Sequence, residues 1–159
     1  KAFVFYRHQP KETLKGSRGY GFVAGTKFNS NCAYASTVSH DCHNLLVVGT
    51  SDEAMALAAN EVIQAGGGIA VVVNGILDAI IELPFAGLMS LEPMEVVAKK
   101  INAVELALKK AGCPYPSIEM TLSLLGLIVI EELHLSNQGL VELKSNAPLK
   151  FVDLIIPEE

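Results

Sequence analysis

The sequence predicts an α+β fold, with a mostly antiparallel or mixed sheet and two main helices. Several short apolar runs have the length and composition of strands, and two longer stretches carry apolar residues at helical spacing. Asn74-Gly75 stands between two of the strand-like runs and is a strong hairpin signal. The chain has 159 residues, half of them apolar, so we expect one domain with its own core over residues 1–159.

The first third of the chain predicts strands separated by polar connections. Residues 1–8 alternate apolar side chains between two faces, as a half-buried strand does. The following residues, 9–17, are polar and contain Pro10 and Gly16, so we expect a loop. Further strands are expected at 21–25, 33–38 and 45–49.

A helix is expected directly after these strands, followed by the hairpin. Residues 50–53 have the form of a capping box, with Thr50 as the N-cap and Glu53 three residues later. Apolar residues at helical spacing continue from Met55 to Ile63, and the helix should end at Gly66. The two strands of the hairpin are expected at 69–73 and 76–83.

The second helix should begin near Pro93, which suits a first-turn position, and end before Gly112 and Pro114. Residues 120–133 are ambiguous, and we expect a short helix followed by extended chain. A turn is expected at 137–139 and a closing strand at 152–156.

Composition excludes several classes of function. The net charge is −5 and the isoelectric point about 5.4, so no basic surface for nucleic acid is expected. The apolar run 122–130 is far shorter than the ~20 residues of a membrane span, and no targeting segment is visible. Three widely spaced cysteines favour free thiols in a reducing cytoplasm. Because the chain begins at Lys1 without methionine, we expect a processed or excised fragment.

The glycine triplet at 66–68 resembles a phosphate-binding loop only in composition. Such loops run from a strand into a helix, whose free amide groups face the anion. Here a predicted helix precedes the triplet and a predicted strand follows it, so the helix end presents carbonyl groups instead. We therefore interpret the triplet as a helix terminator with close packing.

The strongest functional signal is a polar hexad between two buried strands, Ser39-His40-Asp41-Cys42-His43-Asn44. Imidazole, carboxylate and thiol groups are all competent zinc ligands, but a complete site needs His8 or His134 from distant segments. A carboxylate beside an imidazole also raises its basicity, which suits acid–base catalysis. The third interpretation is a satisfied buried polar network. The residue types alone leave these alternatives open.

Several segments together resemble one protein family. They are Arg7-His8, Gly21-Phe22-Val23, residues 35–49 with the polar hexad, residues 66–72, residues 83–90 and residues 120–123. In this combination and order they are similar to the carboxy-terminal domain of bacterial and archaeal adenine deaminases. Two departures stand out: Cys42 replaces the usual serine, and Glu131 replaces the usual proline.

The resemblance implies a role within a larger enzyme that hydrolyses adenine to hypoxanthine and ammonia. In that family, a divalent metal (manganese, iron or zinc) is held by a (β/α)8 barrel of the amidohydrolase superfamily that precedes this domain. We therefore expect no cofactor or activity in this chain alone. Its expected partners are the amino-terminal barrel, adenine and further copies in a homo-oligomer, with no nucleic acid or membrane.

The expected site residues follow from this resemblance together with the density of ionisable groups in the hexad. His40, Asp41 and His43 would support catalysis at the barrel site, and Asn44, Arg7 and His8 would bind substrate. The alternative is a structural or oligomerisation domain with no direct catalytic role.

Overall fold

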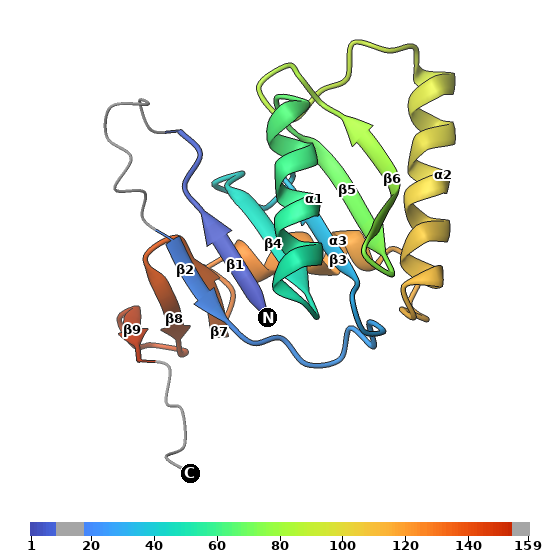
Figure 1. Ribbon diagram of the computed structural model, residues 1–159. Helices are drawn as coiled ribbons and strands as arrows, with labels where there is room; N and C mark the ends of the chain where they lie inside the picture. The colour runs from blue at the N-terminus through green and yellow to red at the C-terminus, as the bar shows by residue number, and fades with distance from the viewer. Residues whose placement is uncertain (9–17, 154–159) are drawn as a thin grey trace.

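The computed structural model describes residues 1–8 and 18–153, and in this part of the chain it shows two antiparallel sheets and three α-helices (Figure 1). The elements are β1 (Ala2–Phe5), β2 (Arg18–Gly21), β3 (Ala33–Ser36), β4 (Leu45–Gly49), α1 (Asp52–Gln64), β5 (Gly68–Val73), β6 (Ile76–Glu82), α2 (Met94–Lys110), α3 (Ile118–Ser123), the 3-10 helix η2 (Leu124–Gly126), β7 (Glu132–Ser136), β8 (Gly139–Leu143) and β9 (Lys150–Val152). The strand orders are β2-β1-β4-β3-β5-β6 and β7-β8-β9. The predicted α+β class with two main helices, α1 and α2, is confirmed.

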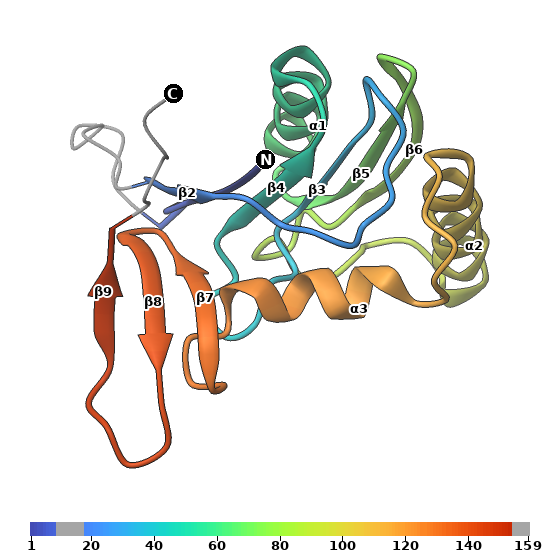
Figure 2. The same cartoon turned by 90° about the horizontal axis from the view of Figure 1, so that it is seen from below.

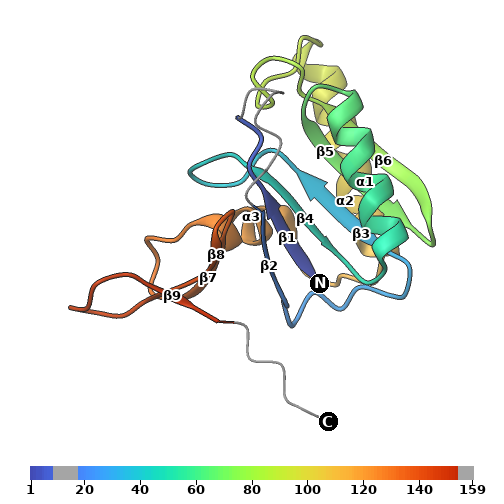
Figure 3. The ribbon, with the colours of Figure 1, turned by 60° about the vertical axis from the view of Figure 1, so that its left-hand side comes forward.

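Helices cover both faces of the six-stranded sheet. Figure 2 shows α1 on one side of this sheet and α3 on the other. One core cluster joins α1 to the sheet through side chains such as Met55 and Val47, and the other joins α2, α3 and β7 to the opposite face through side chains such as Leu108 and Leu46. The three-stranded sheet lies beside β2 (Figure 3), and β2 contacts both β7 and β8.

The hairpin and the helix terminator form as predicted. β5 and β6 pair antiparallel around Asn74-Gly75. The Gly67 amide donates to the Val62 carbonyl at 2.9 Å and so closes the end of α1. Gly66 and Gly67 have φ angles of +77° and +132°, which side chains with a Cβ rarely adopt.

The predicted strand at 21–25 is wrong, because the strand lies at Arg18–Gly21 instead. Its register with β1 explains the difference. Ala2 is the first residue of β1 and pairs with Gly21, so residues 22–25 have no β1 residue left to pair with. Phe22 follows the strand with an exposed side chain.

The predicted N-cap is also displaced by one residue. Ser51, not Thr50, caps α1 by accepting a hydrogen bond from the Ala54 amide at 3.2 Å. The Thr50 hydroxyl is engaged elsewhere, because it accepts from the Cys32 amide and donates to the Asn29 carbonyl. Tertiary contacts therefore decide which of two adjacent hydroxyl residues caps the helix.

The structure shows which elements form in the segment 120–133, for which the sequence was ambiguous. Residues 120–133 include most of α3, then η2 and the first part of β7, in agreement with a short helix followed by extended chain. The turn at 137–139 joins β7 to β8. The predicted strand 152–156 overlaps β9 only at Val152, and residues 154–156 lie outside the described residues, as does the predicted loop 9–17. Among the described helices, none has the length and apolar character needed to cross a membrane.

Replacing the capping serine tests the corrected helix start. Ser51→Ala removes the acceptor for the Ala54 amide, so we expect the free energy of unfolding to fall by about 1 kcal/mol. Urea denaturation of the chain measures this loss. Ser51→Thr keeps the acceptor and should remain close to wild type, whereas equal losses for both variants would contradict the assignment.

Candidate functional site

The segments that carry the sequence signals lie at one end of the six-stranded sheet, where its strands begin or end. Neighbouring strands run antiparallel, so this end of the sheet contains the last residues of β1, β3 and β6 and the first residues of β4 and β5. Arg7-His8 follows β1, the polar hexad joins β3 to β4, and residues 83–90 follow β6. Segments that are up to 80 residues apart in sequence therefore meet at one end of the sheet.

The guanidinium of Arg7 links two of these segments. Its Nε donates to the His43 carbonyl at 2.5 Å, and its Nη2 donates to the Ala86 carbonyl at 2.8 Å. Gly87 has a φ of +74°, and a Cβ added to it would lie only 2.8–2.9 Å from the guanidinium. A side chain at this position would therefore displace Arg7, and the polar hexad is fixed to the loop after β6 by close packing as well as by hydrogen bonds.

Thr37 secures the same region from inside the protein. Its buried hydroxyl donates to the Gly87 carbonyl at 2.6 Å and accepts from the Gly68 amide at 2.9 Å. The Thr37 amide also donates to the Gly68 carbonyl at 3.0 Å. One threonine thus joins the end of β3, the glycine triplet and the loop after β6.

The polar hexad forms a turn, which brings its two histidines together. The His43 amide donates to the Ser39 carbonyl at 2.7 Å, and the His40 amide donates to the Ser123 carbonyl at 3.0 Å. The two imidazole rings meet edge to face, with centroids 5.6 Å apart. In the described part of the chain, no three His, Cys, Asp or Glu side chains are grouped so that they could hold a metal ion.

The surroundings of His43 favour the neutral form of its imidazole. Partial burial lowers its pKa, and the nearby charges of His40 and Arg7 lower it further, while Asp41 acts in the opposite direction. Its Nδ1 is buried and has no hydrogen-bond partner among the described residues. The residue also has a left-handed backbone, with a φ of +46°. The turn therefore holds in a defined place a ring nitrogen that no described residue contacts through a hydrogen bond.

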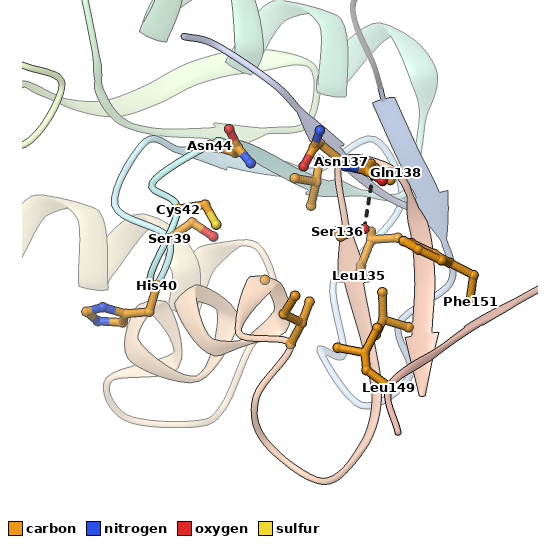
Figure 4. A pocket seen from close by; sticks show the side chains of 14 residues that line it. Ser39, His40, Cys42, Asn44, Leu135, Ser136, Asn137, Gln138, Leu149 and Phe151 are labelled. Carbon is orange, nitrogen blue, oxygen red and sulfur yellow. Dashed lines mark hydrogen bonds between the residues drawn. The ribbon is translucent and has the colours of Figure 1, made fainter. Parts of the chain in front are cut away.

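The other side of the hexad faces a cavity of about 220 Å³ between the two sheets. Asn44 is 4% exposed and lines it, and its Oδ1 has no hydrogen-bond partner in the described part of the structure. Figure 4 shows Cys42 and Asn44 on the same side of this cavity, while the imidazole of His40 points away from it. The hexad therefore presents different side chains on its two sides.

The remaining site candidates lie around the hexad. His8 is exposed, and its Nε2 lies 3.1 Å from the Cys42 carbonyl oxygen. Asp41 is exposed at the tip of the turn. His134 is separate, because its Nδ1 lies 3.2 Å from the Leu124 carbonyl oxygen. The structure thus places all six predicted site residues in or beside the hexad, with Asn44 on the cavity side, and leaves His134 outside this region.

Sequence reasoning missed the parts played by Thr37 and Gly87. Both lie within segments that carry the family resemblance, which is the signal that could have identified them. Glu131, which departs from the family pattern, accepts a hydrogen bond from the Ser145 hydroxyl. This contact ties the segment before β7 to the segment after β8.

Comparison with known proteins identifies the family of the chain. The family model described as "Adenine deaminase C-terminal domain" matches residues 1–147, so the chain belongs to this family. Adenine deaminases of Rubrobacter xylanophilus and Clostridium botulinum are 51% and 46% identical to it, over 89% and 99% of the chain. The adenine deaminase of Moorella thermoacetica is 49% identical over 88% of the chain. The chain spans only about a quarter of the length of these relatives (23–25%). The resemblance predicted from the sequence motifs is confirmed.

The charges around His43 can be tested by titration. NMR should report a pKa for His43 below the ordinary histidine value of about 6.5. Asp41→Asn removes a nearby negative charge and should lower this pKa further, whereas His40→Gln removes a neighbour that lowers this pKa and should raise it. Shifts in the opposite directions would show that these neighbours do not control the proton affinity of His43.

The Thr37 network should contribute measurably to stability. Thr37→Val keeps the shape of the side chain but leaves the Gly68 amide and the Gly87 carbonyl without their hydroxyl partner, which costs about 1–3 kcal/mol. Chemical denaturation measures this loss. Thr37→Ser keeps the hydroxyl and serves as the control. A Thr37→Val variant as stable as wild type would mean that water or other groups replace these bonds.

Proposed function

We propose that this chain is the carboxy-terminal part of a metal-dependent adenine deaminase, in which the polar hexad contributes to the active site of a preceding catalytic barrel. Membership of the family and the names of the relatives support the reaction, hydrolysis of adenine to hypoxanthine and ammonia. The observation that carries the role of the hexad is the buried Nδ1 of His43, which has no hydrogen-bond partner within residues 1–8 and 18–153.

A buried polar atom without a partner is costly, about 1–3 kcal/mol, unless something outside the described residues satisfies it. His43 lies in the connection between β3 and β4, at one end of the sheet. Its ring contacts the ring of His40, and the charge of Asp41 acts on it. A lowered pKa keeps the imidazole neutral near pH 7, so it can accept a proton or a hydrogen bond. These properties suit a residue that meets substrate or another domain.

The proposed reaction gives such a group a task. Hydrolytic deamination forms a C6–O bond, breaks the C6–N bond and moves protons from the attacking water to the departing ammonia. A neutral imidazole near the reacting atoms can relay one of these protons. We assign this supporting role to His43 with His40 and Asp41, and binding of adenine to Asn44, Arg7 and His8. Arg7 would bind adenine through the N–H groups of its guanidinium that do not donate to the His43 and Ala86 carbonyls.

The metal does not fit the residues described here, because no three candidate ligands are grouped. We therefore place the manganese, iron or zinc ion in the preceding barrel and derive no step through it.

The three cysteines are free thiols, which supports the proposal that the enzyme works in the cytoplasm.

Substitution of His43 in the full-length protein tests the proposal. We expect His43→Ala to lower kcat/KM for adenine deamination by at least about tenfold, because it removes the proton-relaying imidazole. Lys109→Ala, on the exposed last turn of α2 at the other end of the sheet, is the control and should keep wild-type kinetics. Wild-type kcat and KM for His43→Ala would refute the role of the hexad.

The alternative proposal is a structural or oligomerisation domain, and exposed apolar side chains such as Phe85 and Met89 favour it. It predicts wild-type kinetics for His43→Ala in an intact oligomer. It also predicts that deletion of this domain changes the oligomeric state, which light scattering would measure.

A further inference from the structure

The loop between β6 and α2, together with the first residue of α2, exposes four large apolar side chains within ten residues. Phe85, Met89, Leu91 and Met94 are 57%, 54%, 76% and 79% exposed. Single exposed apolar residues are ordinary on protein surfaces, but a group of large ones marks an interaction site. We name residues 84–94 the apolar loop.

The apolar loop is held in place by its own backbone and by its neighbours. Phe85 and Met89 exchange two backbone hydrogen bonds, of 3.1 and 3.2 Å. Between them, the Ala86 carbonyl accepts from Arg7 and the Gly87 carbonyl accepts from Thr37. The apolar side chains are therefore displayed by an ordered loop, and binding a partner would cost little additional ordering.

Charged residues border the apolar side chains. Lys100 of α2 forms ion pairs with Glu82, at the end of β6, and with Glu92, inside the apolar loop. These pairs fix the loop to α2 and place charge beside the apolar residues. An apolar centre rich in aromatic and methionine side chains with a charged border is typical of a protein–protein interface.

The apolar loop and the polar hexad belong to one rigid unit. The Arg7 guanidinium bonds to both of them, and Gly87 packs directly against that guanidinium. A partner that reaches His43 would therefore lie beside the apolar loop as well. Whatever covers one of these two neighbouring surfaces is in position to cover the other.

We infer that the apolar loop is the docking surface for the preceding catalytic domain of the same protein. About three quarters of the length of the relatives lies outside the region matched by this chain, so in the relatives a large partner is covalently linked to the corresponding region. The inference rests on the proposed function in one respect, because continuity with the polar hexad selects the catalytic domain as the partner. A second copy of the chain is the competing occupant.

Hydrogen exchange can detect this docking without any measurement of activity. We would compare the 159-residue chain with the full-length protein, both without adenine, in peptides that cover residues 85–94. The full-length protein should exchange these amides at least tenfold more slowly, at every protein concentration. Peptides around Ile76, which is 72% exposed at the opposite end of β6, should exchange equally in both proteins.

Each other outcome overturns the inference. Equal exchange of residues 85–94 in both proteins would show that no domain covers the loop. Protection that disappears when the full-length protein is diluted would assign the loop to a second copy. The result is independent of the proposed reaction. The loop can be protected in a protein that does not deaminate adenine, and His43→Ala can lower kcat/KM in a protein whose loop is not covered.

A matched pair of variants links protection to docking. Leu91→Asp and Ile76→Asp each place a carboxylate at a largely exposed leucine or isoleucine, and neither should change the Tm of the isolated chain. In the full-length protein, Leu91→Asp should restore fast exchange of the apolar loop, while Ile76→Asp should leave the protection intact. Unchanged protection in Leu91→Asp would contradict docking through this loop.

Discussion

The guanidinium of Arg7 is the contact on which the geometry of the candidate site depends. It donates to carbonyl groups of two loops that are remote in sequence, one after β3 and one after β6. A guanidinium suits this task because its donors point in fixed directions in one plane, whereas an ammonium group has no such fixed geometry. Its partial burial lowers the pKa of Arg7, but an arginine stays charged at any physiological pH.

The sheet makes this contact possible. In an antiparallel sheet, alternate strand ends meet at one edge, so three connections of this chain meet within reach of one side chain. Thr37, which is 3% exposed, then joins the end of β3 to the loop after β6 and to the glycine triplet. The histidines are therefore placed by strands and buried hydrogen bonds, which position side chains more accurately than a free loop does.

The sequence predicts the elements of this fold better than the details of their ends. Strand and helix periodicities persist over whole elements, so α1, α2 and the β5–β6 hairpin could be located from residue types alone. Ser51 is the N-cap because Thr50 is bonded to Cys32 instead. β2 ends at Gly21 because Gly21 pairs with Ala2, the first residue of β1. Such partners are set by tertiary structure, which local patterns do not contain.

The same distinction applies to the candidate site. The density of ionisable groups identified the hexad, but the turn that brings His40 and His43 together became apparent only in the structure. The bonds from Arg7 end on backbone carbonyls, and every residue carries a carbonyl. No choice of side chain at positions 43 or 86 could therefore have revealed them.

The arrangement also explains why binding and catalysis would be hard to separate in this domain. One guanidinium donates to both the hexad and the apolar loop, so a movement of the loop on docking would act on the His43 carbonyl through Arg7. The chemistry proposed here needs an imidazole aligned with a reacting atom held by another domain, and small displacements of such a group are costly in rate. A substitution in the apolar loop would then resemble a catalytic defect in a kinetic assay. Hydrogen exchange separates the two, because loss of a proton-relaying ring at position 43 leaves the loop covered, whereas loss of docking uncovers it.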